Sequence, residues 1–235
     1  MYKLIFIDAD NTLFDFREAQ ENAMKKTFED FDYFEKEGNE EEFGKIKEDY
    51  KIINSKLWRE LEKGEIKEEE LKILRFERLF EKNSLKYNTK IFSEKYLERL
   101  SEGSFLLEGA EELCKYLSEK YRIIIITNGI KKVQIPRIEN SKINKYIEET
   151  VVSEDVGISK PNIGIFQYAL DLANKKNKVT KQEIIMIGDS QIADIQGGIN
   201  FGIDTCWVNL KNQQENEDIK AKYTVKSYKE LYNFL

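Results

Sequence analysis

The chain has 235 residues, a length that suits one large domain or a core domain with a smaller insertion. Apolar residues make up 40% of it, enough for a substantial core, and the formal net charge of −6 argues against binding of a nucleic acid polymer. The chain contains no histidine, which excludes Ser-His-Asp and Cys-His nucleophiles and every histidine-ligated metal site. Acid-base chemistry therefore falls to carboxylates, lysine, tyrosine or cysteine.

The cysteine content and the N-terminus indicate a cytoplasmic protein. Cys114 and Cys206 lack metal-ligand spacing and are expected to be reduced, buried thiols. Asp8 and Asp10 interrupt the N-terminal apolar stretch before a signal peptide forms, and no apolar run approaches the ~20 residues needed to span a bilayer. We therefore expect no membrane partner. No sequence feature indicates the oligomeric state.

The first predicted element is a strand at Leu4 to Ile7, an apolar run without polar alternation, as in parallel strands covered on both faces. The cluster "DADNT" follows at once and contains Asp8, Asp10 and Thr12. Two carboxylates so close together repel each other. Their presence therefore indicates either a cation that neutralises them or a reaction that needs both.

The next segment, from Phe14 to about Leu100, contains no proline and few glycines and predicts amphipathic helices. Helical spacing of apolar residues recurs in "QENAMKKTFEDF", "EDYKIINSKLWRELEKGEI" and "EEELKILRFERLFEKN", with breaks at Gly64 and Asn83. We expect an inserted all-helical cap domain over residues 14–104, hinges included, and a core domain formed by residues 1–13 and 105–235. The hinges are expected near residues 13–15 and 101–105.

After the insertion, strands alternate with helices. Apolar runs predict strands at Ile123 to Ile126, Thr150 to Ser153, Ile184 to Ile187 and Thr205 to Asn209. Helical patterns lie between them in "AEELCKYLSEK", "NIGIFQYALDLANKK" and "IADIQGGINFG". This order predicts an α/β fold, a Rossmann-like doubly wound parallel sheet with right-handed crossovers.

Polar residues follow the predicted strands closely, and ligands of open parallel sheets bind beyond the carboxyl ends of the strands. A single aspartate there is often only a helix N-cap, but a cap needs no second carboxylate two residues further on. We therefore expect one shared site, formed by Asp8, Asp10, Thr12, Thr127, Asn128, Lys160, Asp189 and Asp194.

The chemistry of these side chains fits phosphoryl transfer. Converging carboxylates suggest a hard cation, Mg²⁺, that also takes a substrate phosphate oxygen. Asp8 is then the nucleophile that forms an aspartyl-phosphate, and Asp10 protonates the leaving oxygen and later deprotonates water. Lys160, Thr127 and Asn128 stabilise the phosphoryl oxygens.

Four motifs in this order, "DADNT", "ITNG", "SKP" and "GDSQIAD", resemble the haloacid dehalogenase-like (HAD) hydrolase superfamily. The stretches "FIDADNTLFDF", "INSKLWRELEKGEI", "RFERLF" and "SEDVGISKP" are similar to its YjjG/YfnB-type subgroup of pyrimidine 5'-nucleotidases. The resemblance covers the whole chain and places the insertion where the family carries a helical cap. One departure is Asn162-Ile163 after Lys160-Pro161, where relatives often have Asp-Pro, which makes the start of the next helix less certain.

The resemblance also implies roles for the shared site. Asp8 is the nucleophile and Asp10 the general acid and base. Asp194 orients waters of the metal or pairs with Lys160. Substrate binding is implied for Thr12, Thr127, Asn128 and Lys160, and Mg²⁺ is held by Asp8, the main-chain carbonyl of Asp10, and Asp189.

The leading hypothesis is a Mg²⁺-dependent phosphomonoester hydrolase acting on a small molecule, a nucleoside 5'-monophosphate first of all. A sugar-phosphate phosphatase or a phosphomutase of the same superfamily is the alternative. A dehalogenase is disfavoured, because halide needs no proton and Asp10 supplies one. A receiver-like phospho-aspartate signalling module is a further alternative from another class.

Aromatic and apolar residues of the insertion offer two interpretations. Trp58, Leu61, Phe76, Leu79 and Phe80 recur at helical spacing and are expected to pack between helices. Alternatively, Trp58 or a neighbour stacks on a base above the phosphate site.

Overall fold

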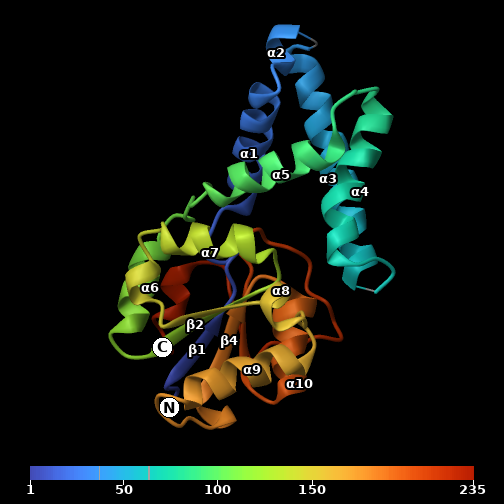
Figure 1. The fold of residues 1–235 in the computed structure, drawn as a ribbon. Helices are drawn as coiled ribbons and strands as arrows, with labels where there is room; N and C mark the ends of the chain where they lie inside the picture. Colours follow the sequence, from blue (N-terminus) through green and yellow to red (C-terminus); the bar gives the residue numbers. More distant parts are fainter. Residues whose placement is uncertain (37, 63) are drawn as a thin grey trace. The chain divides into compact units, whose positions relative to one another are not determined.

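A computed structural model describes residues 1–36, 38–62 and 64–235. Its six strands form one parallel sheet in the order β3-β2-β1-β4-β5-β6. Figure 1 labels the central strands β2, β1 and β4. The predicted doubly wound α/β fold is confirmed. The strands are β1 (Leu4–Ile7), β2 (Arg122–Thr127), β3 (Glu149–Val152), β4 (Ile184–Gly188), β5 (Asp204–Val208) and β6 (Tyr223–Val225).

The helices of the sheet-containing part lie between and after these strands. Several are single turns, and one segment is π-helical. They are α6 (Ala110–Ser118), α7 (Lys131–Glu139), α8 (Ser153–Val156), α9 (Ile163–Asn174), α10 (Gly197–Phe201) and α11 (Tyr228–Leu231), with 3₁₀ turns η1 (Asn144–Tyr146) and η2 (Lys181–Glu183) and the π-helical η3 (Gln191–Gln196).

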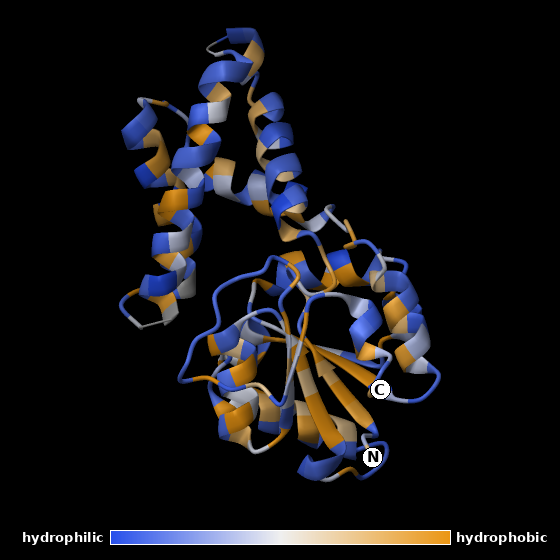
Figure 2. Cartoon of the chain, turned by 180° about the vertical axis from the view of Figure 1, so that it is seen from behind, coloured by the Kyte–Doolittle hydropathy of each residue, from blue (hydrophilic) through white to orange (hydrophobic). Residues whose placement is uncertain are grey.

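Alternate side chains of the central strands pack into two separate cores. Ile5 and Ile7 pack on one face, where α6 and α11 contribute, and Leu4 and Phe6 pack on the other, where α9 and α10 contribute. Side chains of a strand alternate between faces, so a strand covered on both sides has no polar position. This explains the unbroken apolar runs, and Figure 2 shows the strands as a hydrophobic layer.

The chain divides into two compact units. One, the core unit, is formed by Met1–Arg17 and Ser104–Leu235, and the other, the helical unit, by Glu18–Gly103. No strand occurs among the described residues of the helical unit. Its helices are α1 (Phe16–Asp30), which begins in the core unit, α2 (Tyr33–Lys36), α3 (Glu40–Glu62), α4 (Glu68–Asn83) and α5 (Thr89–Ser101).

The helical unit has an aromatic core of its own. Phe76, Leu79 and Phe80 are buried there, as packing between helices requires, whereas Trp58 and Leu61 are only partly buried. The ring of Phe76 lies within 5.0–6.0 Å of four other aromatic rings, those of Tyr50, Phe80, Phe92 and Tyr96.

Some local predictions differ from the structure. Ser153 begins α8 instead of ending β3. The helix expected over "IADIQGGINFG" starts as the π-helical η3, and α10 then ends at Phe201, with Gly202 as its C-cap. The helix after Pro161 starts cleanly, because the side chain of Asn162 accepts a hydrogen bond from the amide of Gly164.

Both cysteines are buried free thiols, as expected, and burial raises the pKa of Cys114 and of Cys206 to about 12. Across the described ranges, no helix has the length and apolar character to cross a bilayer.

Candidate active site

The strand register brings three predicted site residues to one edge of the sheet. Ile7 of β1 pairs with Ile125 of β2 and with Ile187 of β4, so these strands end at nearly the same level. Asp8 follows β1 directly, and its amide donates to the carbonyl of Ile187 at 2.9 Å. Thr127 ends β2, and Asp189 follows β4.

Lys160 reaches this edge from the loop before α9. Its side chain is 1% exposed, and Nζ donates to Oδ1 of Asp8, Oδ1 of Asp194 and the carbonyl of Ile126, each at 2.6 Å. Burial alone would lower the pKa of Lys160, but Asp194 and Asp8 outweigh it and raise this pKa above its ordinary value. The ammonium therefore stays charged at neutral pH.

Asn128 fixes the main chain that carries Lys160. Its Nδ2 donates to the carbonyl of Lys160, and its Oδ1 accepts from the amide of Lys160, both at 2.8 Å. A contact of Asn128 with substrate stays a prediction. The pairing of Asp194 with Lys160, one of the two expected roles of Asp194, is present in the structure.

Asp8, Asp189 and Asp194 form a carboxylate cluster, with one oxygen of each within 4.8 Å of the others. Burial raises the pKa of Asp8 well above its usual range, although Lys160 opposes this. Burial, and next the charge of Asp194, raise the pKa of Asp189 to about 7. Three carboxylates against one ammonium leave an excess of negative charge, and an all-oxygen donor set is what a hard divalent cation prefers.

Gly188 makes room for this cluster. A Cβ atom at this position would lie 2.2 Å from Oδ2 of Asp194, far inside van der Waals contact. The same Oδ2 accepts a hydrogen bond from the amide of Ser190 at 3.0 Å, which ties the side chain of Asp194 to the residue before η3. The "GDS" motif therefore needs a glycine at its first position, because any side chain there would clash with the Asp194 carboxylate.

The carboxylate of Asp10 lies outside this cluster and contacts α7. Its Oδ1 accepts from Nη1 of Arg137 and its Oδ2 from Nε2 of Gln134, both at 2.7 Å. Neither α7 residue was among the predicted site residues. The signal that the sequence offers is weak: a glutamine and an arginine lie three residues apart after "ITNG", in a helix with little periodic apolar pattern.

Thr12 is fully buried and connects two loops. Its Oγ1 accepts from the amide of Asp189 at 3.0 Å, and its carbonyl accepts from the hydroxyl of Tyr228 at 2.6 Å. A contact of Thr12 with substrate stays a prediction. Another residue that the sequence did not single out, Lys211, donates to Oδ1 of Asn11 at 2.9 Å and acts to lower the pKa of Asp189.

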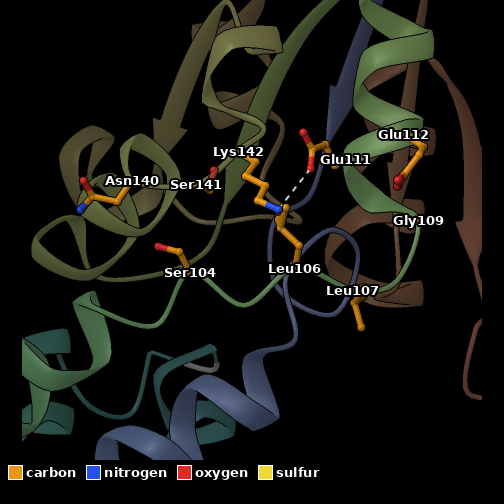
Figure 3. A pocket seen from close by; sticks show the side chains of 9 residues that line it. All are labelled: Ser104, Leu106, Leu107, Gly109, Glu111, Glu112, Asn140, Ser141 and Lys142. Carbon is orange, nitrogen blue, oxygen red and sulfur yellow. Dashed lines mark ion pairs between the residues drawn. The ribbon is translucent and has the colours of Figure 1, made fainter.

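A separate cavity of about 450 Å³ lies elsewhere in the core unit. Its lining residues include none of the site residues above. Figure 3 shows that Lys142 points across it toward Glu111, 3.9 Å away. The lining residues are Ser104, Leu106, Leu107, Gly109, Glu111, Glu112, Asn140, Ser141 and Lys142.

Residues 2–202 match the family described as haloacid dehalogenase-like hydrolase, a stretch that includes every predicted site residue. The chain belongs to the haloacid dehalogenase-like hydrolase family. It is therefore a hydrolase, and the receiver-like alternative is set aside.

Relatives within the haloacid dehalogenase-like family match over the full chain. Pyrimidine 5'-nucleotidase YjjG of Escherichia coli K12 is 34% identical, covering 98% of this chain and 96% of the relative. Pyrimidine 5'-nucleotidase PynA of Streptococcus pneumoniae R6 is 31% identical, covering 100% and 95%. The HAD hydrolase YfnB of Bacillus subtilis 168 is 31% identical, also covering 100% and 95%.

A crystal structure of YfnB has a TM-score of 0.88 to this chain, covering 100% of this chain and 98% of YfnB. That structure is described as bound to magnesium and as revealing interdomain movement. The predicted resemblance to the HAD superfamily and to its YjjG/YfnB-type subgroup is confirmed by these matches.

Proposed function

We propose that this haloacid dehalogenase-like hydrolase is a Mg²⁺-dependent phosphatase that cleaves nucleoside 5'-monophosphates through an aspartyl-phosphate on Asp8. The observation that carries the proposal is the buried carboxylate of Asp8, 2.6 Å from the ammonium of Lys160 and beside two further carboxylates. Such a group is placed to attack an electrophile, and a structural aspartate would gain nothing from two like-charged neighbours.

The residues fit a resident magnesium ion. Asp8, Asp189 and the main-chain carbonyl of Asp10 would hold it, with Asp194 beside them. When bound, the ion supplies the positive charge that keeps the carboxylates ionised and that binds a phosphoryl oxygen. The raised pKa values of Asp8 and Asp189 support this assignment, because burial and the neighbouring carboxylates disfavour the ionised forms that a bound cation would stabilise.

Asp8 attacks the phosphorus atom, a bond forms between its carboxylate oxygen and phosphorus, and the ester P–O bond breaks. Asp10 gives its proton to the leaving oxygen. Asp10 then accepts a proton from the water that attacks the aspartyl-phosphate, so that phosphate leaves and Asp8 is regenerated. Lys160 touches Asp8 directly, and its charge therefore lies next to the phosphoryl group that Asp8 receives.

The substrate class rests on the relatives and on the helical unit. YjjG and PynA bear the name pyrimidine 5'-nucleotidase and cover the whole chain. We assign the helical unit the role of a cap that selects the leaving group, and the partly buried Trp58 is its candidate for stacking on a base.

The test is phosphate release from nucleoside monophosphates, sugar phosphates and phospho-acids, with Mg²⁺ and with a chelator. We expect Mg²⁺-dependent release that is highest with a pyrimidine nucleotide and is lost in Asp8→Asn. Asp171→Asn is the matched control, because Asp171 is an exposed aspartate on α9. No release from any ester, or an Asp8→Asn variant as active as the wild type, would contradict the proposal.

A further inference from the structure

Both carboxylate oxygens of Asp10 are occupied by side chains of α7. Nη1 of Arg137 donates to Oδ1 and Nε2 of Gln134 donates to Oδ2, each at 2.7 Å. Nη1 of Arg137 also donates to Oε1 of Gln134 at 2.8 Å, which closes a ring of three side chains. Two donors on different oxygens fix the plane of a carboxylate, whereas a single donor would leave it free to rotate.

The ring leaves Gln134 a single amide orientation. A guanidinium offers only donors, so the amide oxygen of Gln134 must face Arg137, and its amide nitrogen then faces Asp10. The second N–H of Gln134 donates to Oγ1 of Thr127 at 3.0 Å. That bond uses the hydroxyl as an acceptor, so the proton of Thr127 remains available for a phosphoryl oxygen.

Arg137 and Gln134 are themselves held in place. The side chain of Arg137 is 1% exposed, and its guanidinium lies 5.2 Å and 5.5 Å from the ring centres of Phe14 and Phe16. Gly129 leaves the space that Gln134 fills, because a Cβ at this position would lie 2.9 Å from Nε2 of Gln134. An exposed arginine and glutamine would lack these packing contacts and could not hold a carboxylate in one orientation.

We propose that Arg137 and Gln134 are positioning residues that orient the Asp10 carboxylate for proton transfer to the leaving oxygen. The inference rests on the proposed phosphatase function. Proton transfer by a positioned side chain contributes about 10²- to 10⁴-fold to a rate, and a misplacement of about 1 Å removes about 10²-fold. The effect of losing either residue should therefore depend on how much the leaving group needs a proton.

The test compares two esters in wild type and Arg137→Met, a variant that keeps an apolar side chain against the two rings. The alkyl oxygen of a nucleoside monophosphate needs a proton to leave, whereas p-nitrophenolate leaves without one. We expect kcat/KM to fall about 10²-fold for the nucleotide and less than about 10-fold for p-nitrophenyl phosphate. Arg137→Lys, which keeps the charge, should restore part of the loss on the nucleotide alone.

One mutant background and one control variant separate loss of positioning from a general structural defect. In an Asp10→Asn background, Arg137→Met should cause no further loss, because the group it positions is gone. Arg122→Met is the matched control: Arg122 pairs with Glu148 through two nitrogens at the other end of β2, and its loss should affect both esters equally and weakly. If circular dichroism shows that Arg137→Met is not folded, Gln134→Leu is assayed with the same two esters instead.

Equal losses on both esters, or an additional loss in the Asp10→Asn background, would overturn the positioning role while leaving the phosphatase proposal intact. A wild type that releases phosphate from neither ester would overturn both.

Discussion

Replacing Lys160 by methionine removes the ammonium from the carboxylate cluster and keeps a side chain of similar length. Nζ contacts Asp8 and Asp194 at 2.6 Å each, and the side chain is 1% exposed, so water has little access to take its place. The two carboxylates would then remain buried together with Asp189 and without their cation.

Removing one partner of a buried ion pair costs about 3–5 kcal/mol in the free energy of unfolding. A change of 1 kcal/mol shifts Tm by about 2–4 °C in a domain of this size, so the loss corresponds to about 6–20 °C. The cost should be smaller at acidic pH, because burial raises the pKa of Asp8 and this group can then take up a proton instead of remaining charged.

The assay is thermal unfolding of wild type and Lys160→Met at pH 5 and pH 8, with a chelator present so that no metal ion occupies the carboxylate cluster. We expect the larger difference in Tm at pH 8, and no measurable change in Lys131→Met, which removes an exposed lysine paired with Asp155. A Lys160→Met protein as stable as wild type at pH 8 would refute the reasoning that the carboxylates depend on this ammonium.

Three further predictions concern the cluster and the helical unit. Gly188→Ala should push Asp194 from Lys160, lower the stability by about 1–3 kcal/mol and reduce phosphate release, whereas unchanged activity would show that the loop absorbs the methyl group. Because the folded-state pKa of Asp189 is about 7 instead of 3.8, the folded state binds this proton more tightly, so stability without metal should fall as pH rises between these values. The rise in Tm on adding Mg²⁺ should therefore be larger at pH 8 than at pH 5, and an equal rise would argue against metal binding at this carboxylate. Trp58→Ala should raise KM for a nucleotide more than for p-nitrophenyl phosphate, and an equal increase would exclude base stacking.

The central strands and the cluster were predictable because their signals are local. Leu4 to Ile7 is apolar at every position, as expected for a short strand covered on both faces, and Asp8 follows it without a gap. Parallel strands end at the same edge, so the predicted sheet placed Asp8 and Asp189 at that edge, and the pairing of β1 with β4 in the structure makes them neighbours.

The partners of Asp10 were not predictable in this way. Gln134 and Arg137 lie more than 120 positions further along the chain, in a helix with Pro136 inside it and little periodic apolar pattern. Their contacts depend on the packing of α7 over the strand ends, which no short stretch of sequence encodes. The strand β6 was not predicted for another reason: its three residues, at the edge of the sheet, are too few to show a strand pattern of apolar residues.

Identification of the phosphorylated residue tests the central claim most directly. Protein mixed with p-nitrophenyl phosphate, whose leaving group needs no proton, and Mg²⁺ is quenched in acid and mapped by mass spectrometry. We expect a phosphoryl group on Asp8 that accumulates when Asp10 is replaced by asparagine, because the aspartyl-phosphate still forms from this ester but its hydrolysis lacks a base. Phosphate release without phosphorylation of Asp8, or a phosphoryl group on another residue, would contradict it.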